Sequence, residues 1–97
     1  MFKVYVLENR EDGSWYIGQT DDLERRIHDH NKGTGARTTR LKGENTWKLI
    51  YAEAYLDKHD ALGREKFLKG GSGRTYLKKQ MKHYLNGQAC TIVPDPS

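Results

Sequence analysis

The sequence is poor in several features that would place a protein in particular classes. Its 97 residues include one cysteine, Cys90, so an internal disulfide is excluded and a reducing, cytoplasmic setting is expected. No apolar run approaches the roughly 20 residues that a transmembrane helix needs, and the start of the chain lacks the pattern of a secretory signal. We therefore expect a cytoplasmic protein that makes no membrane contact and that is nucleoid-associated if bacterial.

Acidic residues are missing from one long segment. Between Lys66 and Pro94 the chain has six Lys or Arg side chains and no Asp or Glu. Up to Asn31 it has four basic and seven acidic residues, which leaves 13 of the 17 basic and 6 of the 13 acidic residues for the remainder. A small basic domain with segregated charge is typical of proteins that bind a polyanion, although a solubilising surface is the alternative.

The pattern of apolar residues predicts one α+β domain over residues 1–87 and a loosely held tail over residues 88–97. Aromatic and β-branched residues predict strands at 2–8, 15–19 and 47–55, with the first two joined by a hairpin turn at Gly13. Three helices are expected, at 21–32, after Asp57 or Asp60, and at 74–86, the first and last closed by Gly33 and Gly87. We expect a small three-stranded antiparallel sheet packed with these helices.

Two local details complete this expectation. Thr20 or Asp21 should cap the first helix, because a short side chain with an acceptor oxygen satisfies open N–H groups. Strict alternation along 47–55 would place Trp47, Leu49, Tyr51 and Glu53 on one face of the sheet.

The stretch from Trp15 to His30 carries the main functional signal. It begins as a strand that contains Tyr16 and continues as a helix on which Arg26 and His30 lie four residues apart. That spacing puts both side chains on one side of the helix, from which they can project toward Tyr16. A phenol, a guanidinium and an imidazole at one strand–helix junction suit the chemistry of a phosphodiester.

Glu65 is the second signal. It lies three or four residues from Ala61, Leu62 and Leu68, so it should point toward the core. Carboxylates are almost never fully buried without a partner. Arg64 or Lys69 could neutralise Glu65 as a structural ion pair, and a divalent metal ion is the other candidate.

These residues resemble the GIY-YIG nuclease family. Tyr16-Ile17-Gly18 is the second signature triplet, Arg26 follows its glycine by eight residues, and His30 follows Arg26 by four. Lys3-Val4-Tyr5 keeps only the tyrosine of the first triplet. Glu65 lies in a segment similar to the helix that carries the family's metal-binding glutamate. The resemblance covers most of the chain, from about Phe2 to Lys69.

The resemblance implies hydrolysis of DNA by water, with structure-selective or weakly sequence-selective cleavage in repair, recombination or processing. It implies a catalytic set of Tyr5, Tyr16, Arg26, His30 and Glu65, with Gly18 structural and Glu65 holding one Mg²⁺ (or Mn²⁺) ion. The family pattern makes Tyr16 the general base, with Tyr5 and His30 in support. His30 is chemically the easier base, since it titrates closer to neutrality. Asn86 is a candidate for the family's late asparagine, although Asn86-Gly87 equally predicts a helix end.

A nucleic-acid surface is expected on the basic loop after the first helix and on the last helix. Basic groups and hydroxyls there can contact phosphates. The predicted contacts are Lys32, Arg37, Thr39, Arg40, Lys42, Arg74, Lys78 and Lys82. DNA, branched or single-stranded, is the expected partner, with RNA also open and a protein partner able to supply specificity. The main alternative is a nucleic-acid-binding module that does not cut, which the altered first triplet favours.

Overall fold

Strand β1 (Phe2–Asn9) occupies the centre of the sheet, as its mostly apolar sequence predicts. The computed structural model describes residues 1–33 and 45–89, and every structural statement refers to these residues. Strands β2 (Trp15–Thr20) and β3 (Trp47–Tyr55) pair with β1 on either side, both antiparallel to it, in the order β2-β1-β3. The predicted fold class and three-stranded antiparallel sheet are confirmed.

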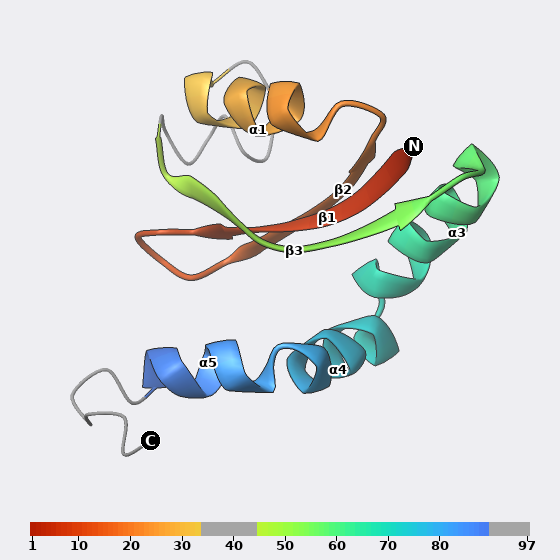
Figure 1. Cartoon of the computed structure of the whole chain (residues 1–97). Helices are drawn as coiled ribbons and strands as arrows, with labels where there is room; N and C mark the ends of the chain where they lie inside the picture. Colours follow the sequence, from red (N-terminus) through yellow and green to blue (C-terminus); the bar gives the residue numbers. More distant parts are fainter. Residues whose placement is uncertain (34–44, 90–97) are drawn as a thin grey trace.

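Helices cover the two faces of the sheet unequally (Figure 1). Helix α1 (Leu23–Lys32) lies on one face, and the layer of α3 (Lys58–Lys69), α4 (Gly71–Gln80) and α5 (Lys82–Ala89) packs against the other. The cause is the alternation along β1, which sends successive side chains to opposite faces. The core between the sheet and α3–α5 consists of Val4, Val6, Ile17, Ala61, Leu68, Leu77 and Met81. The core between the sheet and α1 consists of Tyr5, Leu7 and Trp47, with Tyr16, Leu23 and Ile27 packed against them.

The described residues form four helices rather than the three predicted. The helix expected at 74–86 is two helices, because a non-helical Met81 (φ −108°, ψ 24°) separates α4 from α5. The first of them, α4, also starts earlier than expected, at Gly71. Gly73 lies inside α4. A Cβ atom at Gly73 would overlap the backbone of Phe67 and Leu68, so glycine lets α4 pack closely on the end of α3. Helix α5 also continues past Gly87 to Ala89.

The helix caps follow the predicted chemistry at slightly different positions. Asp22, rather than Thr20 or Asp21, caps α1, and its side chain accepts a hydrogen bond from the Arg25 amide. Asp57 caps α3, as one of the two expected residues. Gly33 ends α1 with φ 78°, as expected for a glycine at a helix end. None of the helices in residues 1–33 and 45–89 has the length and hydropathy needed to cross a bilayer.

A bulge in β3 overturns the predicted alternation of that strand. Val6 of β1 pairs with Tyr51, and the next residue, Leu7, pairs with Leu49, so Ile50 is an extra residue in β3. Trp47 and Leu49 therefore share the face that α1 covers, whereas Tyr51 and Glu53 lie on the opposite face. One inserted residue reverses the facing of everything beyond it, because side chains along a strand alternate with a period of two.

Candidate active site

Two tyrosines from neighbouring strands form the floor of the candidate site. Tyr5 on β1 is buried, Tyr16 on β2 is half-buried, and their ring centroids are 6.3 Å apart. Gly18 pairs directly with Tyr5 across the two strands. A Cβ atom at Gly18 would overlap the Tyr5 hydroxyl and lie 3.0 Å from Cε1 of Tyr16. Only glycine leaves room for both rings here, which agrees with the structural role predicted for this residue.

Helix α1 brings the imidazole onto this floor. Leu23 and Ile27 pack against the sheet and so fix the orientation of the helix. Arg26 and His30 are four residues apart, so their side chains project from the same side of α1. His30 is fully buried, with Nε2 at 3.0 Å from the Tyr5 hydroxyl oxygen and its ring centroid 4.8 Å from that of Tyr16. His30 thus lies beside Tyr16, as its place on the helix predicts, with Tyr5 as its hydrogen-bonding partner.

Burial and the charge of Arg26 set the protonation states of this cluster. Burial raises the pKa of Tyr5 to about 12, although a hydrogen bond from Arg26 opposes the rise and the charge of Glu65 adds to it. Burial lowers the pKa of His30, the positive charge of Arg26 lowers it as well and Asp29 opposes both, so that the pKa is about 4. At neutral pH His30 is therefore a neutral imidazole and Tyr5 a neutral phenol.

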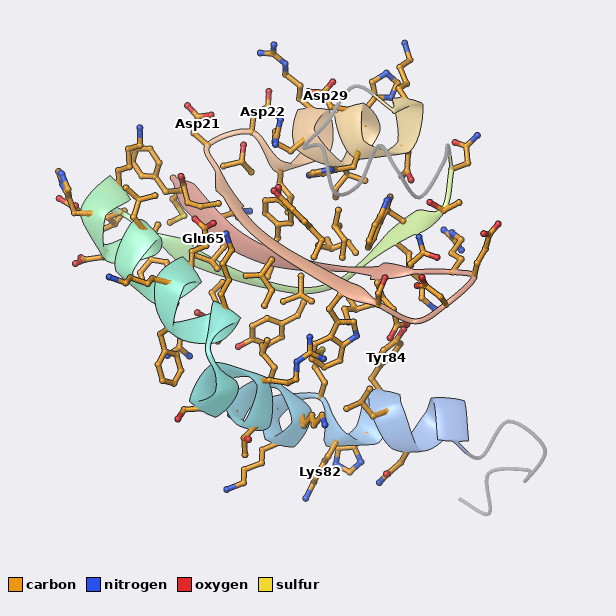
Figure 2. All side chains as sticks on the ribbon, turned by 180° about the vertical axis from the view of Figure 1, so that it is seen from behind. Asp21, Asp22, Asp29, Glu65, Lys82 and Tyr84 are labelled. Atoms are coloured by element: carbon orange, nitrogen blue, oxygen red, sulfur yellow. The ribbon has the colours of Figure 1, made fainter. Side chains whose placement is uncertain are left out.

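Glu65 approaches the cluster from α3. Figure 2 shows it on the side of α3 that faces the sheet. Its side chain is 19% exposed, and one carboxylate oxygen lies 2.7 Å from Nζ of Lys69. Arg64, the other neutraliser considered, instead forms two hydrogen bonds with Glu53, at 2.8 and 3.0 Å. Of the two proposed partners, Lys69 is the one that pairs with Glu65.

The donor set limits which metal this site could hold. Across residues 1–33 and 45–89, no three His, Cys, Asp or Glu side chains gather into a ligand cage. A single carboxylate fits Mg²⁺, which uses oxygen ligands and retains several of its waters. Glu65 is the residue here that could hold such an ion, in exchange for its contact with Lys69.

Asn31 is part of the site architecture and was missed by the sequence analysis. Its side-chain oxygen accepts from the Trp47 amide at 2.9 Å, its side-chain nitrogen donates to the Trp47 carbonyl at 3.1 Å, and its own carbonyl accepts from the Asn45 amide at 2.8 Å. Trp47 is buried, and its ring meets that of Tyr16 edge-on at 6.5 Å. Asn31 thus ties the start of β3 to α1 and holds Trp47 behind Tyr16. An asparagine near a helix end ordinarily indicates a solvent-facing residue, so no local pattern distinguishes Asn31.

The predicted nucleic-acid contacts are not all brought to this cluster. Lys32 is exposed in the last turn of α1, on the same face of the sheet as His30. Arg74, Lys78 and Lys82 are exposed on α4 and α5, and so is Asn86 on α5, across the sheet from Tyr5 and His30. Lys32 and the groups on α4 and α5 therefore lie on opposite faces of the sheet. Arg37, Thr39, Arg40 and Lys42 lie outside the described residues.

The chain is similar to known proteins over most of its length. Residues 1–84 match the family model of the GIY-YIG catalytic domain. A UPF0213 protein of Limosilactobacillus reuteri is 39% identical over 82 residues, which cover 84% of each chain. A UPF0213 protein of Streptococcus pneumoniae serotype 4 is 48% identical over 66 residues, covering 68% of this chain and 64% of the relative. The solution NMR structure of the UPF0213 protein BH0048 from Bacillus halodurans covers 99% of this chain and 89% of its own, with 33% identity and a TM-score of 0.40. The chain belongs to the GIY-YIG catalytic domain family, a family of nucleases.

Proposed function

We propose that the protein is a divalent-metal-dependent endonuclease that hydrolyses DNA phosphodiester bonds, with structure-selective or weakly sequence-selective cleavage in repair, recombination or processing. The observation that carries this proposal is the cluster of Tyr5, Tyr16 and His30, with the charges of Arg26 and Glu65 acting on the Tyr5 hydroxyl. Burying the Tyr5 hydroxyl and the His30 imidazole is less favourable than burying apolar side chains, so stability alone does not explain the presence of these polar groups.

Arg26 is assigned to the scissile phosphate. Its guanidinium is half-buried beside the Tyr5 hydroxyl, where water screens a charge less than at the surface. The planar fork can donate two parallel hydrogen bonds to a phosphate, which a lysine could not reproduce. Glu65 would hold one Mg²⁺ (or Mn²⁺) ion, which when bound supplies charge neutralisation at the phosphate and at the leaving oxygen.

Tyr16 is assigned as the general base. His30 would be a weak base, because its pKa of about 4 means that it binds a proton poorly at neutral pH. Its Nε2 is moreover engaged with the Tyr5 hydroxyl, so its role is to hold Tyr5 in place. Tyr16 is only half-buried, so its hydroxyl can meet substrate and take the proton of the attacking water.

The first test is Glu65→Gln, with Lys69→Gln as the matched control. Both variants break the same ion pair, an i,i+4 pair worth about 0.3–0.5 kcal/mol, so both should keep the fold. Cleavage of linear, nicked, branched and single-stranded DNA, and of RNA, is measured with and without Mg²⁺. We expect Glu65→Gln to abolish cleavage and Lys69→Gln to retain it. Equal activity in the two variants would mean that Glu65 is only a structural ion-pair member.

The second test separates the two candidate bases. Loss of a general base lowers the rate by about 10²- to 10⁴-fold, so Tyr16→Phe should fall in that range and His30→Gln should lose less. In wild type a phenol base should keep raising the rate into the alkaline range, whereas a base with the pKa of His30 would give a plateau from mildly acidic pH upward. An active Tyr16→Phe with an inactive His30→Gln would make His30 the base.

A non-cleaving nucleic-acid-binding module remains the second candidate. The altered triplet Lys3-Val4-Tyr5 and the pairing of Glu65 with Lys69 favour it. It predicts that wild type binds every substrate of the panel and cuts none, at any Mg²⁺ or Mn²⁺ concentration.

A further inference from the structure

The net charge of the chain is concentrated in two helices. Helices α4 and α5 carry Arg74, Lys78, Lys79 and Lys82 and no Asp or Glu. These four charges equal the net charge of +4 of the whole chain, and the other residues balance at 13 basic and 13 acidic. No acidic residue of these two helices offsets their four positive charges, so this layer can attract a polyanion.

Three of these side chains form a solvent-facing surface, which we call the α4–α5 basic face: Lys78, Lys79 and Lys82. All three are exposed, while Leu77, just before Lys78, and Met81, just before Lys82, are buried against the sheet. Within the described part of the chain, no acidic side chain pairs with any of the three. Like charges that lie close together repel, so this arrangement is slightly unfavourable until an anion binds.

The α4–α5 basic face points away from the catalytic cluster. Figure 2 shows Lys82 directed outward from α5, on the side of the molecule opposite Asp21, Asp22 and Asp29. The sheet and the width of a helix, about 10 Å, lie between this face and Tyr5. Because the Debye length is about 8 Å at physiological salt, these lysines act little on a phosphate bound at the cluster.

We propose that the α4–α5 basic face is a second nucleic-acid contact, which binds the phosphate backbone of a duplex arm that does not pass through the catalytic face. The proposal rests on the proposed function, since it takes DNA as the substrate. Lys78 near the end of α4 and Lys82 at the start of α5 lie on either side of Met81, so both can contact phosphates of one DNA strand. A branched DNA can reach both faces at once, whereas a short linear duplex occupies one.

The test compares a basic-face variant, Lys78→Gln/Lys79→Gln/Lys82→Gln, with a charge-matched control, Arg10→Gln/Lys58→Gln/Lys66→Gln. The control residues are also exposed, and they lie on the hairpin and on α3. Affinity for a linear duplex and for a four-way junction with the same number of nucleotides is measured by fluorescence anisotropy at several salt concentrations, without divalent metal. Urea unfolding confirms that both variants fold.

For wild type we expect the junction to bind at least about tenfold more tightly than the duplex, because the second contact acts at high effective concentration. The basic-face variant should lose that preference, and its slope of log affinity against log salt on the junction should become shallower by up to about 2.7, or 0.9 for each lysine. The control should keep the preference. Equal losses on the two DNAs would indicate one continuous surface, and losses matched by the control would indicate net charge alone; either result overturns the proposal.

Failure of this proposal is distinguishable from failure of the nuclease proposal. Because binding is measured without metal, a protein that shows the junction-specific loss but never cuts DNA would retain the second contact and lose the nuclease assignment. A protein that cuts DNA but shows no junction-specific loss would give the reverse result.

Discussion

The burial of His30 makes a quantitative prediction about stability in acid. The side chain is fully buried between Tyr5 and Tyr16, and Arg26 and Asp29 are the charges that act on it. Its pKa is about 4 in the folded protein and has its ordinary value of 6.5 in the unfolded chain. Between these two values the unfolded chain binds the proton and the folded protein does not, so stability falls as the pH is lowered.

The size of the effect follows from the two pKa values. One pKa unit corresponds to about 1.4 kcal/mol, so the contribution of His30 to the free energy of unfolding should fall by about 1 kcal/mol at pH 6, about 2 at pH 5 and about 3 at pH 4. Above pH 7 the contribution is constant. A small domain is stable by about 5–15 kcal/mol, so a loss of this size is readily measured.

Urea unfolding of wild type and His30→Gln at pH 7, 6, 5 and 4 tests this prediction. Glutamine can still hydrogen-bond the Tyr5 hydroxyl but does not titrate, and protonation of carboxylates affects both proteins alike. The difference between the two free energies of unfolding should therefore shrink by about 3 kcal/mol from pH 7 to pH 4. Parallel curves would refute the reasoning, because they would mean that His30 is protonated as easily in the folded protein as in the unfolded chain.

Two further predictions concern residues that hold the site together. Gly18→Ala should destabilise the fold by about 1–3 kcal/mol through overpacking against Tyr5, and should reduce cleavage more than an alanine at the open Gly63 does, as urea unfolding and rate measurements can show. Asn31→Leu leaves the amide and carbonyl of Trp47 without their side-chain partners. It should therefore lower the free energy of unfolding by about 2–4 kcal/mol and quench or shift tryptophan fluorescence. An unchanged spectrum and an unchanged stability would mean that Asn31 does not hold Trp47 in place.

Local patterns made much of this fold predictable. The hairpin at Gly13 fixes which strands pair, and alternation along β1 and β2 then puts Tyr5 and Tyr16 on one face. The spacing of Arg26 and His30 fixes their common direction on α1 once Leu23 and Ile27 anchor it. The grouping of Tyr5, Tyr16 and His30 could therefore be anticipated, because each step depends on the nearest secondary-structure element.

The features that escaped prediction depend on contacts between distant parts of the chain. The extra residue Ile50 fits an alternating pattern as well as a regular strand does, and only the register with β1 reveals it. The partner of Asn31 is 16 residues away. The face of the sheet on which α4 and its Lys78 lie depends on how α4 packs on the end of α3, and helical periodicity does not encode that contact.

The hydrogen bonds of Asn31 to Trp47 and Asn45 also mean that changes in the length of segment 34–44 should be tolerated. Gly33 closes α1 with a hydrogen bond to His30, and Asn45 re-enters the fold on the carbonyl of Asn31, so the segment leaves and returns at almost the same point. Doubling the length of a segment whose ends are fixed together adds only about 0.6 kcal/mol of closure entropy. Relatives or engineered variants could therefore exchange or lengthen it at a small cost in stability, while the geometry around Tyr16 and His30 stays unchanged.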